Sequence, residues 1–182
     1  MLNPPPFAYT QTSKEARMGR IVFLDIDGVL ASQASYNRYK STFAPVGVNP
    51  QTDQRYLDRY CVQRLQTLCD VAKASVVVSS DWRLWYDTDD LIGMLREAGL
   101  TAEVKGITPS GDSREAEVRS WMNDHGLDDD AVVILEDARD MGHLKWRQVQ
   151  PLYAVGFTES DLVDALSLWG LDIPESPGHK LP

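Results

Sequence analysis

The chain has 182 residues with 18 basic and 27 acidic side chains, a formal net charge of −9. This length suits one domain with a full core, and no apolar run approaches a membrane span, so we expect no membrane partner. The excess of acidic residues argues against binding to an extended stretch of nucleic acid, but not against binding to one terminal phosphate. Cys61 and Cys69 lie on one predicted helix at a spacing that suits neither a disulfide nor a metal knuckle. We therefore expect a cytoplasmic protein, while its oligomeric state stays open.

Five short apolar runs, each closed by turn or acidic residues, predict β-strands. Segments of helical period mostly separate them, which is the alternation of a parallel sheet. The predicted fold class is α/β, a Rossmann-like parallel sheet of about five strands with helices on both faces. In chain order the strands are expected at about Ile21–Asp25, Ser75–Ser79, Thr101–Val104, Ala131–Leu135 and Pro151–Val155.

Helices are predicted where apolar residues recur at helical spacing between capping residues. The last two carry acidic or hydroxyl residues three apart at their starts, Asp112 with Glu115 and Thr158 with Asp161. The helices are expected at Cys61–Ala72, Leu91–Ala98, Asp112–His125 and from Thr158 to before Gly170.

The remaining segments break this alternation. Residues 1–18 include three consecutive prolines and no apolar h-region, so we expect a disordered leader rather than a secretory signal. Residues 19–170 form the predicted domain, and 171–182 a flexible tail. Within the domain, residues 31–58 show no clear period, and such a long insertion is typical of a functional lid.

An acidic pair follows the first predicted strand, where Asp25 and Asp27 lead into Gly28. Two carboxylates at the end of a buried strand repel each other unless a cation lies between them. In an acidic protein we expect Mg²⁺, which binds carboxylates, water and phosphate oxygens. The alternative is an ordinary Asp-Gly turn after a buried strand.

Polar residues also follow two other strands. Ser79 ends the second, where a hydroxyl and backbone amides could hold an anion, and Glu136 with Asp137 follows the fourth. Arg114 lies in the first turn of a helix, where the macrodipole disfavours a cation unless an anion is near. Each has an ordinary reading as a turn hydroxyl, a solvated acid or a surface arginine. Together they gather at the carboxyl ends of strands, where ligands bind in open α/β sheets.

This joint pattern resembles the haloacid dehalogenase (HAD) superfamily of phosphatases and phosphotransferases from Arg20 to about Gly170. More narrowly, it resembles the phosphatase-like domain of "Swiss army knife" RNA-repair proteins. The segments that carry the narrower resemblance are Ser79–Arg83, Ile107–Pro109 followed by Arg114, Glu136-Asp137, and Gly156–Thr158.

The resemblance implies a role for each matched position. Asp25 would be the nucleophile that forms an aspartyl-phosphate, and Asp27 the general acid and then the base. Ser79 and Arg114 would contact the phosphoryl oxygens. Mg²⁺ would be held by Asp25, the backbone carbonyl of Asp27 and Asp137.

Two positions depart from the family pattern. The third motif usually carries Lys, whereas the candidate here is Arg114. The fourth motif usually reads Asp-Asp, whereas its first member here is Glu136, so we expect Asp137 to be the ligand. The alternatives are Lys105 and Lys145 for the cationic residue, and Glu136 and Asp140 for the metal ligand.

Other residues are candidates for contact with the rest of the substrate. Those after the second strand are Ser80, Trp82 and Arg83; those in the insertion are Tyr36, Arg38 and Tyr39. Aromatic and basic groups together are typical of sites that stack a base and hold its phosphate. The competing readings are a packed Trp82 with a locally paired Arg83, and a merely solvated lid.

The sequence thus predicts a Mg²⁺-dependent phosphohydrolase. Its substrate would be a phosphomonoester of a nucleotide, a nucleic-acid end or a small metabolite. A phosphotransferase or mutase of the same fold, and a non-catalytic binding module, are the alternatives.

Overall fold

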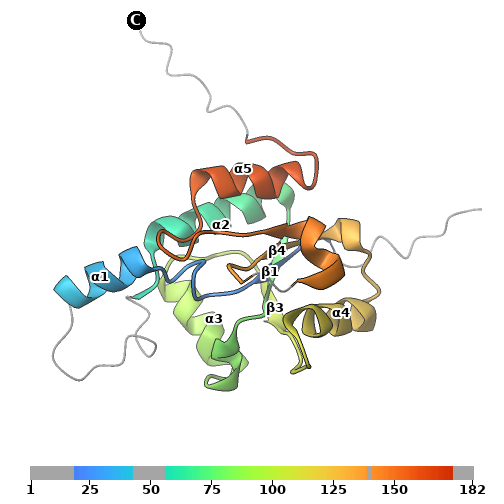
Figure 1. Cartoon of the computed structure of the whole chain (residues 1–182), viewed down its shortest axis with the longest axis horizontal. Helices are drawn as coiled ribbons and strands as arrows, with labels where there is room; N and C mark the ends of the chain where they lie inside the picture. The colour runs from blue at the N-terminus through green and yellow to red at the C-terminus, as the bar shows by residue number, and fades with distance from the viewer. Residues whose placement is uncertain (1–18, 43–55, 139–140, 174–182) are drawn as a thin grey trace, which may run out of the picture.

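Five parallel strands form one sheet in the order β3-β2-β1-β4-β5 (Figure 1). The computed structural model describes residues 19–42, 56–138 and 141–173. Its strands are β1 (Ile21–Leu24), β2 (Ser75–Val78), β3 (Val104–Ile107), β4 (Val132–Leu135) and β5 (Gln148–Val149). The predicted α/β class with a five-stranded parallel sheet is confirmed.

Helices cover both faces of this sheet, with α2 and α5 on one side and α4 on the other (Figure 1). The α-helices are α1 (Gln33–Thr42), α2 (Arg59–Ala72), α3 (Thr88–Glu97), α4 (Arg114–His125) and α5 (Glu159–Ser167). The short 3₁₀ turns are η3 (Asp81–Leu84), η4 (Asp129–Ala131) and η5 (Gly142–Arg147).

Both faces of the central strands are apolar, as expected for a parallel sheet covered on two sides. Val22 and Leu24 join the core cluster of α2 and α5, whereas Ile21 and Phe23 join that of α4. Phe23 meets the ring of Trp121 edge-on, with centroids 5.6 Å apart. Strand β1 pairs with β2 on one side and β4 on the other, so the acidic pair that follows β1 lies between the ends of two buried strands.

The two outer strands differ from the prediction. The third was expected at Thr101–Val104 but is formed by Val104–Ile107, where Gly106 takes a positive φ of 144° beside a register shift. The fifth was expected at Pro151–Val155 but is formed by Gln148–Val149. The segment after Pro151 turns instead, because the carbonyls of Tyr153 and Ala154 accept hydrogen bonds from Gln33 and Ala34.

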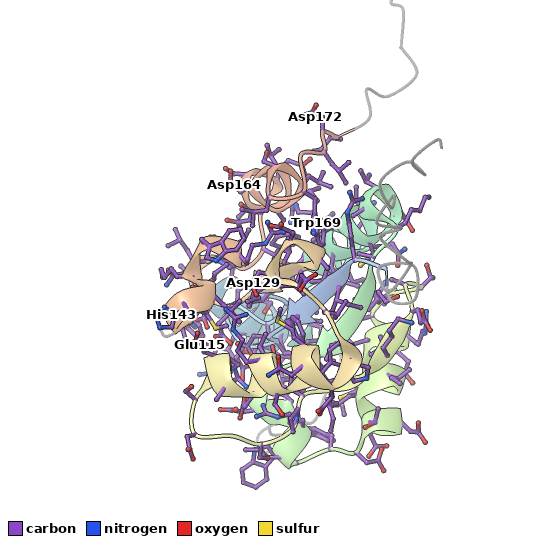
Figure 2. The ribbon with its side chains drawn as sticks, turned by 90° about the vertical axis from the view of Figure 1, so that its right-hand side faces the viewer. Glu115, Asp129, His143, Asp164, Trp169 and Asp172 are labelled. Carbon is purple, nitrogen blue, oxygen red and sulfur yellow. The ribbon has the colours of Figure 1, made fainter. Side chains whose placement is uncertain are left out.

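The start of α4 also differs from the prediction. Its N-cap is Ser113, whose hydroxyl accepts from the Ala116 N–H, rather than Asp112. Glu115 does not close a capping box but accepts from the backbone N–H of His143, and the two residues lie together in Figure 2. The capping box at α5 is confirmed, because Thr158 and Asp161 cap each other reciprocally.

The described residues of the predicted lid include one α-helix. Residues 33–42 form α1, which the lack of a clear apolar period had hidden, and residues 43–55 lie outside the described residues. Residues 1–18 and 174–182, predicted as leader and tail, also lie outside them. No helix among the described residues combines the length and apolar character needed to cross a membrane.

Candidate active site

Three carboxylates meet where the two central strands end. Asp25 follows β1, and Glu136 and Asp137 follow β4, which is paired to β1 in the sheet. One oxygen from each carboxylate lies within 4.8 Å of the others. The Asp25 N–H donates to the Leu135 carbonyl over 2.9 Å, which keeps the ends of β1 and β4 in register.

Burial strongly affects Asp25. Burial, followed by the charge of the neighbouring Glu136 carboxylate, raises the pKa of Asp25 to about 8, while a hydrogen bond from Ser80 and the charge of Arg114 oppose the shift. The charged form is therefore costly without a cation. Three clustered carboxylate oxygens are donors that a hard divalent cation prefers, so this set fits Mg²⁺.

The Asp27 carboxylate is held by an aromatic side chain. Trp82 is buried and donates its indole N–H to Asp27 Oδ2 over 2.9 Å. Burial raises the pKa of Asp27, the Trp82 hydrogen bond lowers it, and the charge of Asp81 raises it. The structure thus places Trp82 against the predicted general acid, in a buried position rather than on an open binding surface.

Gly28 brings the turn after β1 against the acidic loop. It has a positive φ of 76°, and a Cβ there would lie 2.1 Å from Asp137 Oδ2. A side chain at this position would displace the Asp137 carboxylate from the place that it occupies here. Glycine is therefore required both by the backbone conformation and by the close approach.

The two serines after β2 have different surroundings. Both are buried; the Ser79 hydroxyl has no partner within the described part of the chain, whereas the Ser80 side chain bonds to Asp25. A buried hydroxyl without a partner beside a cluster of acids is available to a bound ligand. Ser80, predicted as a substrate contact, instead touches the predicted nucleophile.

Arg114 is enclosed by acidic side chains. Its Nε donates to Glu136 Oε2 (2.9 Å), its NH1 to Glu117 Oε2 (2.9 Å) and its NH2 to Asp81 Oδ1 (3.1 Å). NH1 also donates to the Ser79 carbonyl. Arg114 and its three acidic partners line an open pocket of about 220 Å³, completed by Ser113 and Ala138. Arg114 therefore links the Glu136 carboxylate to the second strand end.

Glu117 is a site residue that the sequence analysis missed. It is buried and bonds to both Arg114 and Arg83, and it also accepts from the Gly111 N–H at 3.2 Å. The available signal was its position three residues after Arg114, a spacing at which opposite charges meet on a helix.

Arg83 is buried, and its NH1 donates to the carbonyls of Ser79 and Ser80. Its ion pairs with Asp81 and Glu117 match the alternative of a locally paired arginine. A substrate contact by Arg83 would require this buried side chain to rearrange.

The three candidate substrate contacts in the insertion differ in burial. Tyr39 lies in the core at 2 % exposure and meets Tyr56 edge-on, so its predicted place on a substrate surface is not what the structure shows. Arg38 is half-exposed and pairs with Asp58 at 3.0 Å. Tyr36 is partly buried, and its ring centroid lies 6.0 Å from that of Tyr56.

The alternative residues take other positions. Lys105 pairs with Glu103, and Lys145 donates to Gln150, so among the described cations it is Arg114 that joins the acidic cluster. Asp140 lies outside the described residues. Glu136 belongs to the carboxylate cluster together with Asp137 and also pairs with Arg114, so its carboxylate is a candidate ligand as well.

The sheet, the acids at its central strand ends and the arginine beside them define a HAD-fold hydrolase of the phosphatase type. The chain belongs to the family described as the HAD domain in Swiss Army Knife RNA repair proteins, whose model matches residues 21–162. This match confirms the resemblance predicted from the sequence, and HAD domains generally use Mg²⁺. Comparisons with curated proteins and with solved structures gave no match.

Proposed function

We propose that the chain is a Mg²⁺-dependent phosphomonoesterase that acts through an aspartyl-phosphate on Asp25. The observation that carries this proposal is the meeting of Asp25, Glu136 and Asp137 within 4.8 Å, beside an Asp27 held by Trp82. Asp25, Asp137 and the Asp27 carbonyl would hold Mg²⁺, with Glu136 as a further oxygen donor. When bound, Mg²⁺ supplies positive charge that offsets repulsion between these carboxylates and the phosphate oxygens.

In the first half of the reaction, a carboxylate oxygen of Asp25 attacks phosphorus. The bond between phosphorus and the leaving oxygen breaks, and Asp27 gives its proton to that oxygen, which leaves as an alcohol. Burial raises the pKa of Asp27, which favours the protonated form that this step requires. The Ser79 hydroxyl, which has no hydrogen-bond partner among the described residues, would donate to the phosphoryl oxygens.

In the second half, Asp27 accepts a proton from a water molecule whose oxygen attacks phosphorus. The bond between phosphorus and Asp25 breaks, which releases inorganic phosphate and restores the carboxylate. The same Asp27 carboxylate thus donates a proton in the first half and accepts one in the second. The hydrogen bond from Trp82 would keep this carboxylate in one position during both proton transfers.

The substrate class that we propose is a terminal phosphomonoester of a nucleotide or RNA end. The family description, which refers to RNA repair, supports this class. Tyr153, an exposed ring next to Tyr56, also supports it, because nucleobases stack on such rings. Tyr56 connects this ring to the site, because burial and the neighbouring Tyr153 and Asp27 all raise the pKa of Tyr56. Tyr153 itself is half-exposed, so its ring is open to a base.

The test measures release of inorganic phosphate from nucleoside monophosphates, 5′- and 3′-phosphorylated oligoribonucleotides and sugar phosphates, with Mg²⁺ or with EDTA. We expect Mg²⁺ to be required and Asp25→Asn to retain less than about a hundredth of the rate. Asp124→Asn, an exposed acid on α4, is the matched control and keeps full activity.

Activity in EDTA, or a rate above that limit in Asp25→Asn, contradicts the mechanism. A preference for sugar phosphates contradicts the substrate class alone. Transfer of phosphate to an added alcohol in place of water would identify a phosphotransferase.

A further inference from the structure

Two glutamines hold the backbone of the acidic loop from the edge of the sheet. Gln148 Nε2 donates to the Glu136 carbonyl (2.7 Å) and to the Ala138 carbonyl (2.6 Å). Gln150 Nε2 donates to the carbonyl between them, that of Asp137, over 2.8 Å. Three successive carbonyls after β4 are therefore bound by side-chain amides from β5 and the residue that follows it.

These contacts constrain the direction of the Asp137 side chain. A peptide bond is planar, so the position of its carbonyl oxygen largely determines the orientation of the whole unit. The Glu136 carbonyl belongs to the plane before the Asp137 Cα, and the Asp137 carbonyl belongs to the plane after it. Gln148 holds the first plane and Gln150 the second, which together restrict φ and ψ of Asp137 and hence the direction of its Cβ.

The orientation of each amide follows from its partners. Carbonyl oxygens only accept hydrogen bonds, so each glutamine must turn its NH₂ group toward the loop. Gln150 is held further by Lys145, whose ammonium donates to Gln150 Oε1 over 3.1 Å. The N–H of Glu136 also donates to the Val149 carbonyl at 3.2 Å, so the loop is tied to this edge from its first residue.

We propose that Gln148 and Gln150 are positioning residues that orient Asp137 for the divalent cation. The inference rests on the proposed function, because it assigns a supporting contact to that metal site. Mg²⁺ requires near-ideal octahedral geometry, so a ligand carboxylate that drifts weakens binding even when every ligand is present. Partners outside the ligand set commonly change metal affinity by about 10- to 100-fold when they are removed.

The experiment measures metal binding directly on the metal-free chain. Mn²⁺ affinity is determined by electron paramagnetic resonance, and Mg²⁺ affinity from the concentration that gives half of the maximal thermal stabilisation. Gln150→Met and Gln148→Met keep the side-chain length and remove the amide donor. We expect each to weaken both affinities by about 10-fold or more. Gln150 is exposed, so its variant is expected to fold.

Gln66→Met is the matched control. Gln66 lies on α2 and accepts from the backbone N–H groups of Thr101 (2.6 Å) and Ala102 (2.9 Å), ahead of β3 and away from the acids. It should lower the melting temperature and leave both affinities within about twofold of wild type. If wild type binds the cations and Gln148→Met and Gln150→Met bind them equally well, the positioning role is overturned while the proposed function stands. If wild type binds neither cation, the proposed metal site and the positioning role both fail.

Discussion

The indole N–H of Trp82 and the carboxylate of Asp27 are joined by a hydrogen bond of 2.9 Å. Trp82 lies on η3, the turn after β2, so this contact ties the predicted general acid to a neighbouring strand end. An indole N–H only donates, so it occupies one carboxylate oxygen and leaves the other to carry the transferable proton. If Asp27 is the general acid that we propose, we expect this hydrogen bond to position its carboxylate for proton transfer.

Trp82→Phe removes the N–H and keeps an aromatic ring. We expect kcat/KM for an alkyl phosphate to fall about 10- to 100-fold, because its alkoxide leaves poorly without a proton from Asp27. For p-nitrophenyl phosphate, whose leaving group needs little protonation, we expect a change of less than about threefold. Trp121→Phe alters a buried tryptophan on the opposite face of the sheet and controls for lost indole volume. Equal losses on both substrates would contradict the positioning role.

The pKa of Asp25 predicts how the stability of the metal-free chain depends on pH. The folded chain keeps a proton on Asp25 up to about pH 8, whereas the unfolded chain releases it near the ordinary aspartate pKa of 3.8. The folded state therefore binds more protons in this window, and the free energy of unfolding falls as pH rises, by up to ~1.4 kcal/mol per pH unit.

Asp25→Asn should remove this loss of stability. In EDTA, we expect its melting temperature to exceed that of wild type by a margin that is small near pH 4 and largest at pH 8. Each 1 kcal/mol corresponds to about 2–4 °C for a domain of this size. Calorimetry across this range checks the slope, and Mg²⁺ should reduce the margin by stabilising wild type. A margin that does not change with pH would contradict the assigned pKa.

Gly28→Ala should displace the Asp137 carboxylate, because the new Cβ would lie 2.1 Å from Asp137 Oδ2. We expect Mg²⁺ affinity and phosphatase activity to fall by at least about tenfold. Gly126→Ala is the control, since Gly126 has a similar positive φ of 65° but no atom within 4 Å of an added Cβ. Both variants should lose about 1 kcal/mol or more of stability from backbone strain, and Gly28→Ala alone should lose metal binding. Equal metal binding in the two variants would show that the close approach is unimportant.

Glu136 and Asp137 should respond differently to substitution. Asp137→Ala should weaken Mg²⁺ binding with little loss of stability, because Asp137 makes no ion pair among the described residues. Glu136→Ala should lower the melting temperature as well, because it removes a buried partner of Arg114. Thermal melts with and without Mg²⁺ separate the two effects. If Glu136→Ala weakens Mg²⁺ binding more than Asp137→Ala does, Glu136 is the principal ligand.

The central part of the fold could be predicted from local patterns. The runs before Asp25 and Glu136 are buried on both faces, so they appear in the sequence as continuous apolar stretches. Parallel strands place their carboxyl ends at one edge of a sheet, and this rule predicts from the sequence that the two acidic segments lie together. The edge strands were misplaced because they are short, and glycine or glutamine interrupts their apolar pattern.

The contacts among the site residues could not be predicted in this way. Sequence alone identified Asp25, Asp27, Asp137 and Arg114 as residues suited to phosphate chemistry. Only the tertiary structure shows that Trp82 holds Asp27, that Glu117 joins two arginines, and that glutamines from the sheet edge hold the acidic loop. The reason is physical: residue type and local spacing determine what a side chain can donate or accept. Which distant group it meets depends on how strands and helices pack.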